Sequence, residues 1–162
     1  MDTRVEPLSA ILRLNARLLI NCLDGLTDEV ARVRHAEGAN SVTFIAAHVT
    51  DTRFFMLRTL GGLLDNPLAV SFDKVKRIDD VTNWPTLDTI RAAWIDVSAA
   101  IDSQLQDATD DDLSAPVDRQ FPGVERTRLG ALTFLVQHDS YHIGQVALLR
   151  KPAGLPAMTY RL

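Results

Sequence analysis

The chain has one cysteine, Cys22, among its 162 residues, so it cannot form an internal disulfide. A lone cysteine is typical of proteins from a reducing compartment, and we expect a cytoplasmic location. Long apolar runs are missing as well, since none approaches the ~20 residues that cross a bilayer. Residues 1–20 contain five charged side chains, where a signal peptide needs an apolar core. We therefore expect no membrane partner.

Clusters of basic residues are also missing. Lysine and arginine total 17 against 21 aspartates and glutamates, a net charge of −4, so no basic block is available to follow a phosphate backbone. We expect no nucleic-acid partner. The sequence contains no nucleophile elbow, P-loop or dinucleotide-binding glycine motif. Average proportions of hydrophobic (46%) and charged (23%) residues exclude disorder, and the length predicts one domain over 1–162.

Apolar residues recur at helical spacing in four long segments, which predict four amphipathic helices. These segments are 7–24, 41–60, 86–107 and 127–150. Each begins at a residue suited to a first turn or an N-cap, namely Pro7, Ser41, Thr86 and Thr127. A single further helical turn is expected from Thr27.

Four such helices predict an all-α fold, a four-helix bundle. The connector between the second and third helices, residues 61–85, is long enough to cross the bundle, which favours up-down-down-up order over four simple hairpins. Within it, residues 68–78 alternate weakly between apolar and polar side chains and form a weak strand candidate.

A faint internal repeat relates the two halves of the chain. Residues 43–48 and 133–138 share the pattern Thr-Phe-apolar-x-x-His, and each follows a Thr-Asp pair, at Thr27 and at Thr109. Two related hairpins, 1–61 and 86–150, would place His48 and His138 face to face across a pseudo-twofold axis. The alternative is chance similarity between two amphipathic helices.

Three of the four histidines can be placed in one site. His138 and His142 are four residues apart, so they share one helix face. His48 lies on the apolar stripe of another helix, and bundle interiors hold metal sites built from facing helices. Three histidines with a vacant fourth position are typical of catalytic zinc, although nickel or iron accepts the same ligands. Alternatively, hydrogen bonds hold the buried imidazoles. His35 lies in a polar connector and is expected to be structural or exposed.

Other residues near these histidines have possible supporting roles. Asp51 and Asp139 could orient a metal-bound imidazole, but we expect surface charges at both positions. Tyr141 and Gln145 could offer a hydroxyl and an amide to a ligand. Cys22 lies on an apolar face without basic neighbours, which favours a buried inert thiol over a nucleophile.

The chain resembles the DinB-like superfamily over about residues 5–160. The motifs that carry this resemblance are the segments 36–42, 44–51 and 138–150 and the tail Gly154-Leu155-Pro156. The resemblance implies an up-down-down-up four-helix bundle, a homodimer, and a divalent metal (zinc, nickel or iron) held by His48, His138 and His142.

The same resemblance implies a metal-dependent enzyme acting on a small-molecule substrate, by hydrolysis or by thiol-cofactor-dependent transfer. A low-molecular-weight thiol is the cofactor implied by the second reaction. The alternatives are a non-catalytic dimeric bundle that binds metal or is purely structural, and a partner-binding module that uses the crossover 61–85.

Overall fold

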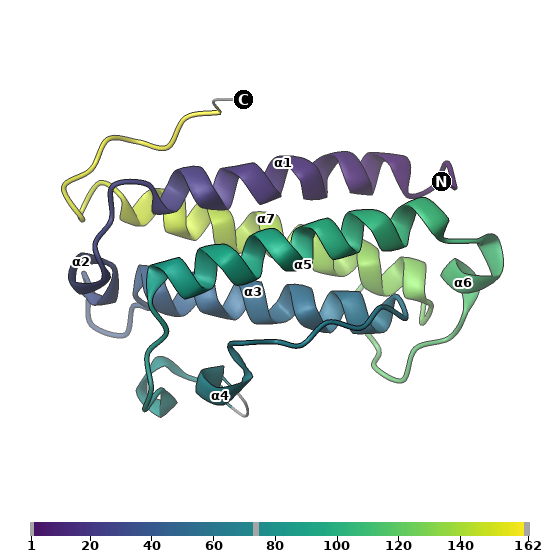
Figure 1. The fold of residues 1–162 in the computed structure, drawn as a ribbon, viewed down its shortest axis with the longest axis horizontal. Coiled ribbons are helices and arrows are strands. Elements are labelled where there is room, and N and C mark those ends of the chain that lie inside the picture. The colour runs from purple at the N-terminus through teal and green to yellow at the C-terminus, as the bar shows by residue number, and fades with distance from the viewer. Residues whose placement is uncertain (1, 73–74, 161–162) are drawn as a thin grey trace.

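The computed structural model describes residues 2–72 and 75–160, and the regular structure within them is helical. Four long helices lie side by side: α1 (Glu6–Leu23), α3 (Val42–Thr59), α5 (Leu87–Asp107) and α7 (Arg128–Leu149) (Figure 1). The connectors hold α2 (Asp28–Arg32), α4 (Ala69–Phe72), the 3₁₀ helix η1 (Ile78–Asp80) and α6 (Asp110–Ser114). The all-α prediction is confirmed.

The four long helices pack in a ring. Both α1 and α3 contact α5 and α7, so α1 lies diagonally opposite α3. In Figure 1, α1 and α7 run in one direction while α3 and α5 run in the other. This arrangement places α3 directly against α7, and these two helices carry the three histidines of interest.

Hydroxyl side chains cap three of the four long helices, as expected, and Pro7 lies in the first turn of α1. Ser41 Oγ accepts a hydrogen bond from the backbone N–H of Phe44, and Thr127 Oγ1 accepts one from the N–H of Gly130. Thr86 caps α5 in the same way. Each cap satisfies an amide that has no partner within its helix, which is why the boundaries were readable from local sequence.

The crossover from α3 to α5 forms no strand in its described part. Residues 69–72 form α4 instead, and residues 73–74 of the strand candidate lie outside the described residues. The Phe72 ring packs on Phe44 of α3, with ring centroids 5.7 Å apart. Leu68 and Phe72 are buried, whereas Val70 between them is 86% exposed, so the alternating apolar residues do not share one buried face.

The two halves of the chain repeat one order of elements, long helix, short helix, long helix. The short helices α2 and α6 are both capped by threonine, Thr27 and Thr109. This order supports the internal repeat, and it places His48 on α3 and His138 on α7 at corresponding positions.

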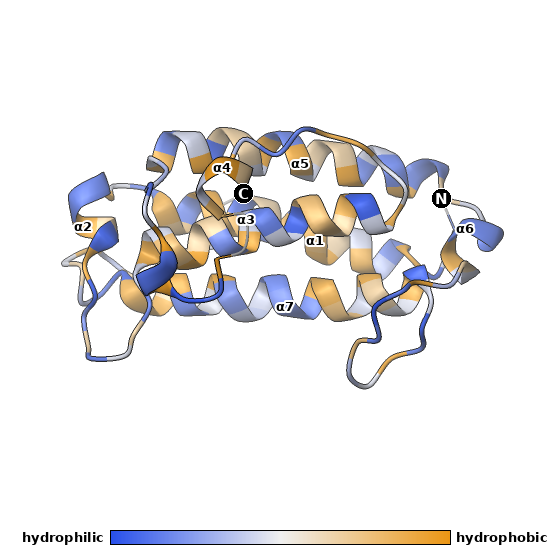
Figure 2. Cartoon of the chain, turned by 90° about the horizontal axis from the view of Figure 1, so that it is seen from below, coloured by the Kyte–Doolittle hydropathy of each residue, from blue (hydrophilic) through white to orange (hydrophobic). Residues whose placement is uncertain are grey.

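Apolar side chains on the inner faces of all four long helices form one core. Hydrophobic and hydrophilic residues alternate along each long helix in Figure 2. Fully buried core residues include one from each helix: Leu19, Met56, Trp94 and Val146. Among the described helices, none has the length and apolarity that a membrane span requires.

Candidate metal centre

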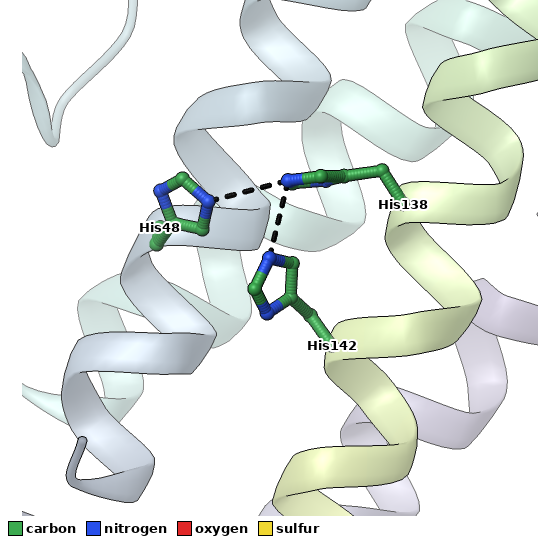
Figure 3. A group of neighbouring side chains, drawn as sticks. All are labelled: His48, His138 and His142. Carbon is green, nitrogen blue, oxygen red and sulfur yellow. Dashed lines mark hydrogen bonds between the residues drawn. The ribbon is translucent and has the colours of Figure 1, made fainter. Parts of the chain in front are cut away.

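His48, His138 and His142 converge at the α3–α7 interface (Figure 3). The Nε2 atom of His138 lies 3.4 Å from Nε2 of His48 and 3.1 Å from Nε2 of His142. The packing of α3 against α7 thus gathers the three residues that the sequence singled out. That they bind a metal stays a prediction.

The two short spacings, 3.4 and 3.1 Å, fit ligands of one divalent cation, and the three ligand atoms all lie within 4.8 Å of one another. Two nitrogens bound at 2.0–2.1 Å lie about 3.4 Å apart in a tetrahedral site and about 3 Å apart in an octahedral one. Within the described residues, no carboxylate or thiol joins the three histidines as a further ligand in the group. The residues present could therefore hold a metal ion and leave positions for other ligands.

Burial keeps these rings neutral. It lowers the pKa of His48 to about 4, and the charge of His142 lowers it further. The pKa of His138 is also about 4, because of burial and of the charges of His142, His48 and Arg119. Burial lowers the pKa of His142, against a hydrogen bond to Gln145 that raises it. Neutral imidazole is the form that binds metals, so these pKa values favour coordination at pH 7.

Gln145 fixes the orientation of His142. Its amide oxygen Oε1 lies 2.7 Å from Nδ1 of His142 and can only accept, so Nδ1–H donates. Nε2 of His142 therefore carries a lone pair facing the cluster. The sequence offered Gln145 as a contact for a bound ligand; the structure uses it to hold a histidine, the outer-shell role common around metals.

Hydrogen bonding within the described residues does not satisfy His138. If Nε2 carries its proton, it can donate to His142, but Nδ1 is then a buried acceptor without a partner. If Nδ1 carries the proton, that buried donor has no acceptor, and the Nε2 lone pairs of His138 and His142 face each other at 3.1 Å. A cation among the Nε2 atoms would resolve this second conflict.

Phenylalanine rings flank the cluster on both sides in matching positions. Phe44 lies four residues before His48 and Phe134 four residues before His138, and each pair has ring centroids 6.4 Å apart. These rings displace water and so contribute to the lowered histidine pKa values. A second ring backs each one, Phe72 on Phe44 and Phe121 on Phe134.

The expectation of a surface charge at Asp139 is wrong. Asp139 is fully buried, and its Oδ2 accepts from Nε of Arg53 at 2.7 Å. The Arg53 guanidinium also donates to Ser98 Oγ (2.5 Å) and to the Leu12 carbonyl (3.1 Å), and it lies 3.7 Å from the centre of the Trp94 ring. One buried arginine thus connects α3 to the other three long helices.

The sequence did contain a signal for this pair. Arg53 follows Val49 by four residues and precedes Met56 by three, so it occupies a position in the buried stripe of α3. An arginine buried there needs an anionic partner. Asp51, the other carboxylate considered, accepts from Nδ2 of Asn66 at 2.6 Å and so contacts the crossover.

The remaining candidates lie outside the cluster. Tyr141 is 57% exposed, with its ring centroid 5.1 Å from that of His142. Cys22 is buried, as expected, and burial raises its pKa to about 11. The expectation that it has no basic neighbour is wrong, because the Arg150 guanidinium donates to the Cys22 carbonyl at 2.7 Å, and its charge lowers the thiol pKa against the effect of burial. His35 is half-buried in the connector after α2, as expected for a residue outside the site.

Two solved structures share this fold. A DinB-like protein from Bacillus cereus ATCC 10987 is 24% identical, with a TM-score of 0.72 over 96% of each chain. A conserved protein from Enterococcus faecalis is 18% identical, with a TM-score of 0.72 over 93% of this chain and 96% of its own. No curated protein matches the sequence. Residues 11–146, most of the length, match the DinB superfamily, and the chain belongs to that superfamily.

Proposed function

We propose that the protein is a divalent-metal-dependent enzyme in which His48, His138 and His142 are the metal ligands. The meeting of their three Nε2 atoms carries this proposal. The rings are held neutral, and neither tautomer of His138 satisfies both of its nitrogens among the described residues. Zinc, nickel and iron all accept three imidazoles, so the ligand set is compatible with each.

When bound, a divalent ion lowers the pKa of a water or thiol in its open position and so supplies a nucleophile near neutral pH. The chain's own residues prepare the site for this chemistry. Gln145 holds His142 in one tautomer, and the rings of Phe44 and Phe134 exclude water from the imidazoles. The reaction we propose is hydrolysis, or transfer involving a low-molecular-weight thiol, on a small-molecule substrate.

A second candidate is a non-catalytic dimeric bundle in which the histidines bind metal or only support the fold. One observation favours it: Nε2 of His138 lies within hydrogen-bonding distance of Nε2 of both His48 (3.4 Å) and His142 (3.1 Å), so the imidazoles also contact one another directly. This candidate predicts that His142→Ala changes stability and no activity.

For the assembly, we propose a homodimer with up-down-down-up helix order. The helix directions in Figure 1 support the order. Large apolar side chains exposed on three of the long helices support self-association: Ile11, Ile95 and Leu148. The net charge of −4 argues against a nucleic-acid partner, and the single buried Cys22 supports a cytoplasmic location.

Metal analysis tests the proposal. Protein purified without chelator is expected to contain about one metal ion per chain, and added Zn²⁺, Ni²⁺ or Fe²⁺ is expected to raise the melting temperature of metal-free protein. His142→Ala should lose both properties, and His35→Ala, at a histidine outside the cluster, should keep them. Less than about 0.2 metal per chain with no rise in melting temperature would contradict metal binding.

Activity assays separate the two candidates. Two assays are used, ester hydrolysis and thiol conjugation to an electrophile, each with metal-loaded and metal-free protein. We expect turnover in at least one assay with metal-loaded protein, none with metal-free protein, and none with His142→Ala. Metal binding without turnover in either assay favours the structural bundle.

A further inference from the structure

A cavity of about 270 Å³ opens where the C-terminal half of α3 meets the connector between α6 and α7. Phe55 of α3 and Phe121 of the connector form an apolar wall, with ring centroids 6.3 Å apart. Arg119 and Arg128 also line this cavity. Phe121 is buried, so the connector is anchored on the bundle at this point.

The guanidinium of Arg119 is positioned to receive an anion. It lies 5.1 Å from the centre of the Phe121 ring, at the edge of the apolar wall. Its side chain is exposed, and the hydrogen bonds and ion pairs found among the described residues leave it without a partner. Arg128 adds a second positive charge, held loosely by Asp112 at 3.8 Å. Asp118 is the acidic residue among those that line the cavity, and Asp112 opposes the charge of Arg128 from outside the lining.

The backbone before Arg119 is fixed. Pro116 and Thr127 form an isolated antiparallel bridge, and the N–H of Val117 donates to the Arg126 carbonyl at 3.3 Å. The Arg126 guanidinium in turn donates to the carbonyls of Val117 (2.8 Å) and Asp118 (2.9 Å). A cavity wall held in place before binding loses less entropy when a ligand arrives.

Two packed aromatic rings connect this cavity to the three histidines. The Phe121 ring packs on Phe134 at 5.0 Å between centroids, and Phe134 packs on His138 at 6.4 Å. A molecule bound on Phe121 would therefore be separated from His138 by two aromatic rings, Phe121 and Phe134.

We propose that this cavity binds the carboxylate of a small amphipathic substrate, with its apolar or aromatic body on Phe55 and Phe121 and its carboxylate on Arg119. A guanidinium matches a carboxylate with paired hydrogen bonds, and the flat rings match an apolar body. The role as a substrate site rests on the proposed function, whereas the binding itself does not depend on metal.

The test uses the full-length chain, freed of metal by chelation and then of chelator by dialysis. Phenylacetate is titrated into ¹⁵N-labelled protein at pH 7, and backbone amide shifts report the site. Phenylacetamide, of the same shape without charge, is the matched ligand. Arg119→Gln removes the proposed contact, and Arg17→Gln, an exposed arginine on α1 outside this cavity, removes the same charge elsewhere.

Phenylacetate should shift the amides of residues 117–121 saturably. Its Kd should rise about fivefold or more in Arg119→Gln and stay within about twofold in Arg17→Gln, and phenylacetamide should bind about fivefold more weakly than phenylacetate. Absent or non-saturable shifts, shifts centred elsewhere, an unchanged Kd in Arg119→Gln, or equal binding of the two ligands would each overturn the proposal. Because the titrated protein is free of metal, a negative result contradicts the carboxylate site without contradicting the metal site. Conversely, a protein that binds no metal can still bind phenylacetate in this cavity.

Discussion

The Nε2 atoms of His48 and His138 meet 3.4 Å apart across the α3–α7 interface, from corresponding positions in the two halves of the chain. His142 joins them one helical turn further along α7, at 3.1 Å from His138. A second copy of the Thr-Phe-apolar-x-x-His pattern thus supplies a facing histidine, and the extra histidine of α7 completes a three-nitrogen group. The corresponding position on α3, four residues after His48, is Thr52, which donates to the His48 carbonyl instead.

Acid should destabilise the metal-free protein between about pH 6.5 and 4. Histidine in an unfolded chain binds a proton near pH 6.5, whereas the pKa of His48 and His138 in the folded protein is about 4. In this window the unfolded state holds more protons, so the free energy of unfolding falls as the pH falls. Urea unfolding at several pH values measures the slope. His48→Gln should flatten it, and an unchanged slope in that variant would contradict protonation of the buried histidines as the cause.

Gln145→Ala should weaken metal binding about tenfold, because His142 loses the acceptor that fixes its tautomer. Competition with a coloured zinc chelator measures the affinity. Gln145→Glu keeps an acceptor at this position and should retain tight binding, and Tyr141→Phe, at the exposed neighbour, should have no effect. Equal affinities for the alanine variant and the original protein would refute the role of Gln145.

Asp139→Asn should lower the free energy of unfolding by about 3–5 kcal/mol, because it leaves the buried Arg53 cation without its anion. Replacing both residues, as Arg53→Met with Asp139→Leu, should recover part of this loss. The exposed pair Arg13–Asp102 provides the control, since Asp102→Asn is expected to cost less than about 1 kcal/mol. Similar costs for the buried and exposed variants would contradict the structural role of Arg53.

Two glycines of α7 should respond in opposite ways to alanine. A Cβ at Gly130 would lie 2.1 Å from the Glu125 carbonyl oxygen, so Gly130→Ala should cost about 1–3 kcal/mol. At Gly144 a Cβ would meet no described atom within 4 Å, and Gly144→Ala should raise stability by up to about 1 kcal/mol through helix propensity. Thermal unfolding compares them. A stabilising Gly130→Ala would show that the connector does not press against α7 at Glu125.

Features set by local sequence could be predicted from this chain. The caps at Ser41 and Thr127 follow from hydroxyl chemistry at a helix start, and the shared face of His138 and His142 follows from four-residue spacing. That His48 faces His138 could also be predicted, because the internal repeat places the two histidines at corresponding positions in the two halves of the chain.

Features set by contacts between distant segments could not be predicted. Arg53 and Asp139 are 86 residues apart, so the position of Arg53 in the buried stripe of α3 signals its burial but not which carboxylate pairs with it. The cavity at Arg119 forms where the 115–127 connector packs against α3. That packing depends on the burial of Phe121, which no repeating sequence pattern predicts. The strand candidate at 68–78 was misleading because its alternating apolar residues do not share one buried face: Leu68 and Phe72 are buried, and Val70 is exposed.

X-ray absorption at the zinc edge of the zinc-loaded protein tests the central claim most directly. Three imidazole nitrogens at about 2.0–2.1 Å, with at least one further ligand from water or substrate, are the expected coordination shell. His142→Gln should reduce the imidazole count by one or lose the metal. A protein that retains no zinc after gel filtration, or zinc whose coordination shell is unchanged by His142→Gln, would contradict the three-histidine centre.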